Sequence, residues 1–249
     1  MLELYHWEPN GVSARVLLCL AEKGLPFQRH YVDVLALEQH QPAFIALSRE
    51  GQVPVLVHDG EPFTDATLIC EYLEDVFVGR RLMPVDAEGR WRVRVWQKYV
   101  DELMGPAVTH IAWSIFRPWT GPVLDAVKTA PTEDSRQAWR QALAGYGDAM
   151  LVADRAEIDT AVGKLEGALA QSRWLVGPEL TLADIAVFSY ARYIPKVLPE
   201  LLGAERAPRT SAWLDRMSSR DAFREVSQLG RAKAPFLMAA PGPERLRWG

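Results

Sequence analysis

The chain has 249 residues, 49% of them hydrophobic, which is enough for one large or two modest domains with a well-filled core. Its 28 basic and 32 acidic side chains give a net charge of -4, so no basic field draws it to nucleic acid or to an anionic membrane. Since no secretory leader is evident and no apolar run approaches the ~18 residues that span a bilayer, we expect a cytoplasmic protein with a small substrate.

Strand and helix signals alternate over residues 1–77. The last two predicted strands are joined by Asp59-Gly60, which is a strong hairpin signal. The predicted order is a strand at 2–6, a helix from Ser13 to Gly24, a strand at 27–32, a helical or irregular stretch at 41–47, strands at 55–57 and 61–63, and a helix at 64–77. This β-α-β-α-β-β-α order predicts an α/β domain of the thioredoxin-like class.

The rest of the chain shows helix and loop signals only, which predicts a linker at 78–87 and an all-α domain at 88–249. The prolines of segment 118–132 predict a loop over a cleft. A long amphipathic helix should begin near Ala87, because apolar residues recur at helical spacing at Trp91, Val95, Trp96, Tyr99, Val100 and Leu103.

Further along, helical character resumes from Glu133 to Ala170, and Gly145-Tyr146-Gly147 should divide it into two helices. Thr181 and Asp184 predict a capping box at the start of another helix, with Leu180 packed on Ile185 as its hydrophobic staple. The tail at 234–249 contains prolines and should be irregular.

The two cysteines, Cys19 and Cys70, lie in apolar helical patterns and not in a Cys-x-x-Cys spacing. We expect buried structural thiols, with a redox pair as the alternative. No His or Cys spacing fits a metal site, and no glycine-rich motif fits a nucleotide, so we expect neither cofactor.

Pro54 interrupts the apolar run that follows Gly51 and places Val53 in extended backbone at the start of a strand. This run, the thioredoxin-like order, the helical second domain and the Thr181-x-x-Asp184 box occur together. On these features the chain resembles the glutathione S-transferase family over nearly its whole length. Within that family it is similar to the bacterial lignin β-etherases, which cleave β-aryl ethers with glutathione. That likeness lies in segments 38–40, 51–54, 69–75 and 95–102, and it is weak from 115 to 172.

The resemblance implies the glutathione transferase fold, a thioredoxin-like domain followed by an all-helical one, with glutathione as co-substrate. It also implies a cis bond between Val53 and Pro54. A homodimer is expected through the helix at 64–77 and the helix that contains Arg94 and Asp101.

Thiol activation is expected at the start of the first helix. The resemblance implies that the Ser13 hydroxyl and the helix N-terminus stabilise the glutathione thiolate, which is then the nucleophile. Asn10 is the alternative donor, through its side-chain amide. Without the family match, Ser13 reads more simply as the cap of its helix.

Glutathione itself is expected along the strand edge. The resemblance implies that Val53 pairs its backbone with the cysteinyl unit at an edge shaped by Pro54, while His40 and Gln52 lie near the glycyl carboxylate. A solvated loop histidine is the alternative for His40. Asp65 corresponds to the acid that pairs with the γ-glutamyl ammonium, and its alternative is an ordinary helix-start acid.

The chain departs from the family at Ala66, where a serine usually donates to the γ-glutamyl carboxylate. The backbone N–H remains, but a hydrogen bond to a charged group contributes about 1.5 to 3 kcal/mol, so the affinity for glutathione should fall by about ten- to a hundredfold. Thr67 is a candidate to compensate from the next position.

The second substrate is expected between the first loop and the long helix, in an aromatic-rich set that suits aryl ligands. Core packing at the domain interface is the alternative for each aromatic member, and His110 is either a ligand to a substrate hydroxyl or a core histidine. The set comprises Trp7, Pro9, His110, Trp113 and Phe116.

Three functions remain open at this stage. The leading one is a glutathione transferase whose thiolate displaces a phenolate from an aromatic electrophile, as in β-aryl ether cleavage. The second is a general glutathione-conjugating transferase. The third, favoured by Ala66, is a non-catalytic protein of the same family that binds ligands or partners.

Overall fold

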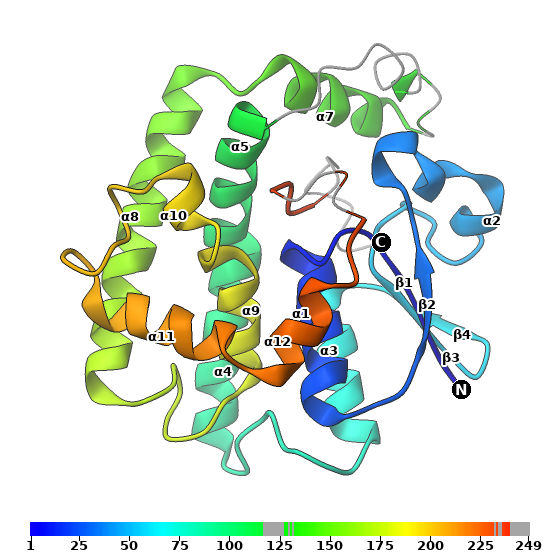
Figure 1. The fold of residues 1–249 in the computed structure, drawn as a ribbon. Helices are drawn as coiled ribbons and strands as arrows, with labels where there is room; N and C mark the ends of the chain where they lie inside the picture. Colours follow the sequence, from blue (N-terminus) through cyan, green and yellow to red (C-terminus); the bar gives the residue numbers. More distant parts are fainter. Residues whose placement is uncertain (117–126, 129, 131, 232, 234–235, 240–249) are drawn as a thin grey trace.

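The computed structural model describes residues 1–116, 127–128, 130, 132–231, 233 and 236–239 (Figure 1). Its amino-terminal part follows the predicted order. The elements are β1 (Leu2–His6), α1 (Gly11–Lys23), β2 (Gln28–Tyr31), two 3-10 turns (Val34–Ala36 and Glu38–His40), α2 (Pro42–Ile45), β3 (Val55–His58), β4 (Glu61–Phe63) and α3 (Ala66–Val76).

The four strands form one sheet in the order β2-β1-β3-β4, parallel between β1 and β2 and antiparallel elsewhere. Because successive side chains of a strand point to opposite faces, β3 serves two cores. Leu56 packs with α1 and α3, whereas Val55 and Val57 pack with Phe44 of α2 on the other face (Figure 1). The thioredoxin-like prediction is therefore confirmed.

The carboxyl-terminal part is helical in its described residues. The elements are α4 (Ala87–Tyr99), a π-helical turn (Val100–Met104), α5 (Gly105–Phe116), α7 (Glu133–Ala144), α8 (Asp148–Gln171), α9 (Leu182–Ala191), α10 (Ile194–Val197), α11 (Pro208–Ser218) and α12 (Asp221–Ser227). The predicted division at Gly145 is confirmed. Most of the predicted loop at 118–132 and most of the tail at 234–249 lie outside the described residues.

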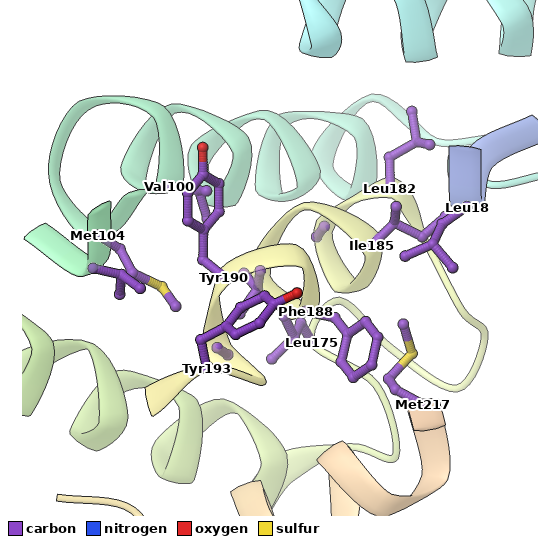
Figure 2. Close-up of a cluster of buried hydrophobic side chains, with 14 of the residues drawn as sticks. Leu18, Val100, Met104, Leu175, Leu182, Ile185, Phe188, Tyr190, Tyr193 and Met217 are labelled. Carbon is purple, nitrogen blue, oxygen red and sulfur yellow. The ribbon is translucent and has the colours of Figure 1, made fainter. Parts of the chain in front are cut away.

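Helix α9 is the centre of the helical part, because all its residues are buried and it packs against α1, α4 and α11. Figure 2 shows the apolar cluster around it, with Phe188 and Ile185 between neighbouring helices. The predicted capping box is confirmed. Asp184 accepts hydrogen bonds from the Thr181 backbone and hydroxyl at 3.0 and 3.1 Å, and from Leu175 N and Trp213 Nε1 at 3.0 Å each.

The apolar face predicted for the long helix is only partly correct. Val100 is buried, but Trp91, Val95 and Leu103 are 63%, 46% and 47% exposed. The buried side is formed by Val93, Gln97, Val100 and Met104, of which only Val100 belongs to the predicted face, because this is the side that packs on α9. The helical period was predicted correctly, but two faces of one helix carry apolar side chains.

Cys19 and Cys70 are fully buried and form no disulfide with each other, which confirms the prediction of buried thiols. A hydrogen bond with Cys70 and burial raise the pKa of the Cys19 thiol well above its ordinary value. Among the described residues, no helix is long and apolar enough to cross a bilayer. In the same part of the chain, no three His, Cys, Asp or Glu side chains are grouped to hold a metal ion.

Candidate functional site

The start of α1 is the first part of the site. Ser13 is the third residue of this helix and is 2% exposed, and its Oγ accepts a hydrogen bond from the Trp7 backbone N–H at 3.2 Å. The N-cap position belongs to Asn10, so Ser13 is not the cap of its helix. The Ser13 hydroxyl proton has no acceptor among the described residues and is available to a ligand.

The Asn10 side chain does not cap α1 either, because it is bound from two other directions. Its Nδ2 donates to the carbonyl of Leu237 at 3.1 Å. Its Oδ1 accepts from the Tyr193 hydroxyl and, at 3.3 Å, from Arg192 Nη2. The family resemblance marks Asn10, but no signal in the sequence marks these three partners, which lie far away along the chain.

The segment after α12 covers the start of α1 (Figure 1). Trp113 Nε1 donates to the Ala239 carbonyl at 3.1 Å, and the ring of Phe236 stacks on Phe116 with centroids 4.5 Å apart. Met238 is 1% exposed and lies directly on Gly11, where an added Cβ would stand 2.2 Å from the Met238 carbonyl oxygen. The prolines of this tail predict only an irregular segment, and no signal in the sequence assigns it to the site.

The Val53-Pro54 bond is cis, as the family resemblance implies. The backbone N–H and C=O of Val53 have no hydrogen-bond partner among the described residues, although β3 begins only two positions later at Val55. Next to Val53, the Gln52 N–H donates to Ser48 Oγ at 3.0 Å. The segment therefore presents an unpaired backbone edge of the kind that binds an extended peptide.

His40 packs against this edge at Gly51, where an added Cβ would stand 2.6 Å from His40 Nδ1. Both ring nitrogens are shielded from solvent and lack a partner among the described residues. Burial lowers the pKa of His40, so its ring is neutral near pH 7. This environment does not fit a solvated loop histidine.

Asp65 forms the N-cap of α3 with a positive φ of 67°, which is uncommon for a residue other than glycine. Its Oδ1 accepts from the N–H groups of Thr67 and Leu68 at 2.8 and 3.0 Å. Its Oδ2 has no partner among the described residues. Asp65 thus caps its helix and still offers one oxygen, and Ala66 follows it as the first, buried residue of α3.

Thr67 does not replace the missing serine at position 66. Its hydroxyl donates to Asp101 Oδ2 at 2.7 Å and accepts from Arg15 Nη1. Arg15 is 1% exposed and also binds Asp101 Oδ1 at 2.7 Å. The Thr67 hydroxyl is therefore part of an ion-pair network that joins α1 and α3 to the π-helical turn, and the expected compensation is wrong.

Three members of the aromatic set predicted for the second substrate, Trp7, Trp113 and Phe116, pack with residues 236–239 of the tail. Trp7 and Trp113 are buried in one cluster with Trp139 and Leu237, as the core alternative described. His110 lies one turn before Trp113 and has other contacts. Its Nδ1 lies 3.1 Å from Asp154 Oδ2, and its ring lies 4.3 Å from that of Tyr146. Pro9 contributes its carbonyl, which accepts from Arg192.

Comparison with known proteins identifies the family. Residues 12–76 match the description "Glutathione S-transferase, N-terminal domain", and residues 119–221 match "Glutathione S-transferase, C-terminal domain". The sequence is 35% identical over 237 residues to Protein LigF of Sphingobium sp. strain SYK-6, covering 90% of this chain and 92% of that protein. The chain belongs to the glutathione S-transferase family. Glutathione is the co-substrate of that family, and this chain is a glutathione-dependent transferase.

Other relatives extend the likeness. The crystal structure titled beta-etherase LigF superposes with a TM-score of 0.84 and covers 91% of this transferase and 98% of that chain. Glutathione S-transferase 3 of Zea mays is 28% identical over 229 residues, covering 90% of this chain and 92% of the maize protein. The glutathione transferase fold predicted for the whole chain is confirmed.

Proposed function

We propose that this transferase holds glutathione with its thiol at the start of α1, where Ser13 stabilises the thiolate. The support is the Ser13 hydroxyl, which accepts from Trp7 and keeps its own proton for a further acceptor. The positive end of the helix dipole favours an anion at the same place. Asn10 is the alternative donor, and its amide is bound to the Leu237 carbonyl in the free protein.

The remaining tripeptide follows the edge described above. Val53 pairs with the cysteinyl backbone beside Pro54, and His40 and Gln52 lie towards the glycyl end. The free Oδ2 of Asp65 pairs with the γ-glutamyl ammonium. The backbone N–H of Ala66, which has no partner among the described residues, serves the γ-glutamyl carboxylate.

The proposed reaction is cleavage of a β-aryl ether that carries a ketone next to Cβ. The thiolate sulfur attacks Cβ, a carbon–sulfur bond forms, and the Cβ–oxygen bond breaks. The electron pair leaves with the phenolate, which takes a proton from water, and no redox partner is needed. The single observation that carries this proposal is 35% identity over 90% of the chain to LigF, whose crystal structure is titled beta-etherase.

The test is incubation with glutathione and a synthetic α-keto β-aryl ether, with the free phenol and the glutathione thioether measured together. Equal amounts of the two products are expected. Ser13→Ala should reduce their rate of formation by about a hundredfold, because one donor to the developing charge is lost. Ser135→Ala, in α7, removes another buried serine hydroxyl and should leave the rate unchanged. No phenol release by the unaltered protein would exclude the ether reaction.

Turnover of a chloronitroaromatic without ether cleavage would instead favour a general conjugating transferase. Binding of aryl ligands with no turnover of either substrate would favour the non-catalytic alternative that Ala66 suggests. In that case Ser13→Ala changes no rate, because there is none to lose.

A homodimer is proposed through α3 and α4. Apolar side chains on these two elements are exposed beside a groove of about 470 Å³, and charged residues such as Glu71 and Arg94 line it. Leu68 is 64% exposed in this face. Leu68→Glu should give a protein of one-chain mass in light scattering, because a charge is poorly tolerated in a buried interface. Val152→Glu, at a residue that is 68% exposed on α8, should keep the mass of two chains.

A further inference from the structure

Arg192, which follows the last residue of α9, is a cation that no described carboxylate neutralises. Its Nη2 donates to the carbonyl of Pro9 and, at 3.3 Å, to Asn10 Oδ1. The guanidinium also stacks on the rings of Tyr193 at 4.5 Å and Phe223 at 5.1 Å. Its Nε is shielded from solvent and has no partner among the described residues. Burial lowers the pKa of Arg192, but a guanidinium remains charged at neutral pH.

Tyr193, the residue after Arg192, also binds the side-chain amide of Asn10. Its hydroxyl donates to Asn10 Oδ1 and accepts from Arg192 Nη2. Burial raises the pKa of Tyr193 to about 12, so the phenol keeps its proton near neutral pH. Figure 2 shows its ring in the buried cluster around α9. The hydroxyl is therefore a fixed donor to Asn10.

These two donors decide which way the Asn10 amide faces. An arginine has no acceptor, so a reversed amide would turn its NH₂ group towards the guanidinium, donor against donor. With Oδ1 held by Arg192 and Tyr193, Nδ2 faces the opposite way. The acceptor it meets there is the Leu237 carbonyl, at the start of α1 and next to the helix turn that carries Ser13.

Glu8, the carboxylate that acts on Tyr193, does not offset this arrangement. Glu8 accepts from the Tyr31 hydroxyl at 2.6 Å and from the backbone N–H groups of Arg231 and Lys233 at 3.1 to 3.3 Å. It influences the pKa of Tyr193 but forms no ion pair with Arg192. A buried cation without a counter-ion is unfavourable, and an anion nearby relieves that cost.

We propose that Arg192 and Tyr193 are positioning residues that hold the Asn10 amide with its NH₂ towards the glutathione sulfur, whose place the Leu237 carbonyl takes in the free protein. The inference rests on the glutathione site proposed above. Asn10 then donates to the thiolate beside Ser13, the guanidinium adds positive potential behind it, and binding of glutathione releases the Leu237 carbonyl.

The positioning can be tested without glutathione. In the free protein, hydrogen exchange of the Asn10 side-chain NH₂ is measured by NMR, with the signal assigned by its loss in Asn10→Ala. Tyr193→Phe and Arg192→Met should each speed this exchange by about tenfold, the factor for one lost hydrogen bond. Arg216→Met is the matched control. Like Arg192, Arg216 stacks on an aromatic ring, the indole of Trp174 at 5.0 Å, and its shielded Nε has no partner among the described residues. Unchanged exchange in both site variants overturns the positioning.

The second measurement is the pKa of the bound glutathione thiol, read from thiolate absorbance in the binary complex. Arg192→Met should raise that pKa by about one pH unit, and Arg192→Lys, which keeps the charge, should raise it less. In an Asn10→Ala background the same Arg192→Met change should have at most half the effect, because the two residues act through one bond. Equal effects in both backgrounds would show that Arg192 does not act through Asn10.

Failure of the proposed function is distinguishable from failure of this inference. If the unaltered protein does not bind glutathione, the proposed function fails and the assignment of Asn10 to the sulfur falls with it. The exchange measurement still decides whether Arg192 and Tyr193 hold the amide. If Arg192→Met does not fold, Tyr193→Phe carries both measurements, since it removes a single hydroxyl.

Discussion

Helices α9 and α1 both begin with residues that favour a helix start, but their first turns are used in opposite ways. At α9, Asp184 accepts four hydrogen bonds from three residues, so its carboxylate is saturated. At α1, neither Asn10 nor Ser13 caps its own helix, and the chain's own tail lies over the first turn. A helix start whose donors are capped by a side chain stabilises the fold, as at α9. A helix start without a side-chain cap, as at α1, leaves donors for a ligand.

The start of α3 combines both uses. Asp65 caps the helix with Oδ1 but leaves Oδ2 without a described partner. Its φ is positive, and residues in such sparsely populated conformations cluster at ligand sites. Substitutions at the three helix starts should therefore have three different effects: on stability at α9, on stability and the tail contact at α1, and on glutathione affinity at α3.

The largest effect is expected at α9. Asp184→Ala leaves the Trp213 Nε1, the Leu175 N–H and the Thr181 donors without their acceptor in the core. We expect the free energy of unfolding to fall by about 3 kcal/mol and the melting midpoint to fall by about 6 to 12 °C. Calorimetry measures both. The glutathione affinity of the folded fraction should be unchanged, and a weaker affinity would contradict the purely structural assignment of this helix start.

The second largest effect is expected at the start of α1. Gly11 has φ 44° and Met238 directly above it, whereas Gly24 has φ 65° with nothing within 4 Å of an added Cβ. Gly24→Ala should therefore destabilise by about 1 kcal/mol from backbone strain alone, and Gly11→Ala by about 2 kcal/mol or more.

Trypsin distinguishes the two glycine variants further. Gly11→Ala should speed cleavage after Arg231, because the tail can no longer lie on α1, while Gly24→Ala should not. Equal cleavage rates in the two variants would show that the tail is not held at Gly11.

The smallest effect is expected at α3, and it is a gain. Ala66→Ser restores the hydroxyl that the family carries beside the γ-glutamyl carboxylate, and Thr67 does not supply it here. The Kd for glutathione should fall by about tenfold in calorimetric titration, the value of one hydrogen bond to a charged group. Ala87→Ser, at the same helical position of α4, is the control and should leave the Kd unchanged. An unchanged Kd in Ala66→Ser would show that the γ-glutamyl carboxylate does not bind at this turn.

Local features of the fold could be predicted from the sequence. The Asp59-Gly60 turn has φ values of 50° and 91°, as a two-residue hairpin of this type needs, and both determinants are adjacent in the chain. The Thr181 and Asp184 box is equally local. The buried face of α4 could not be predicted in this way, because it depends on where α9 packs and not on the period of the helix.

The candidate site was predicted from the family resemblance. Among the described residues, Ser13, Val53 and Asp65 each have a polar group without a partner. The partners of Asn10 carry no local signal, since Arg192 and Leu237 come to it from distant parts of the chain. Their roles depend on tertiary contacts that no periodicity or cap signature encodes.

The Arg15 ion pair limits how freely the two halves of the chain can be exchanged during evolution. Its guanidinium belongs to α1, but the carboxylate of Asp101 belongs to the helical half. Losing one partner of a buried pair costs about 3 to 5 kcal/mol. A chimaera that joins residues 1–77 to another transferase's helical domain therefore folds poorly unless that domain brings its own acid to Arg15, so recombination at the linker is constrained by one charge.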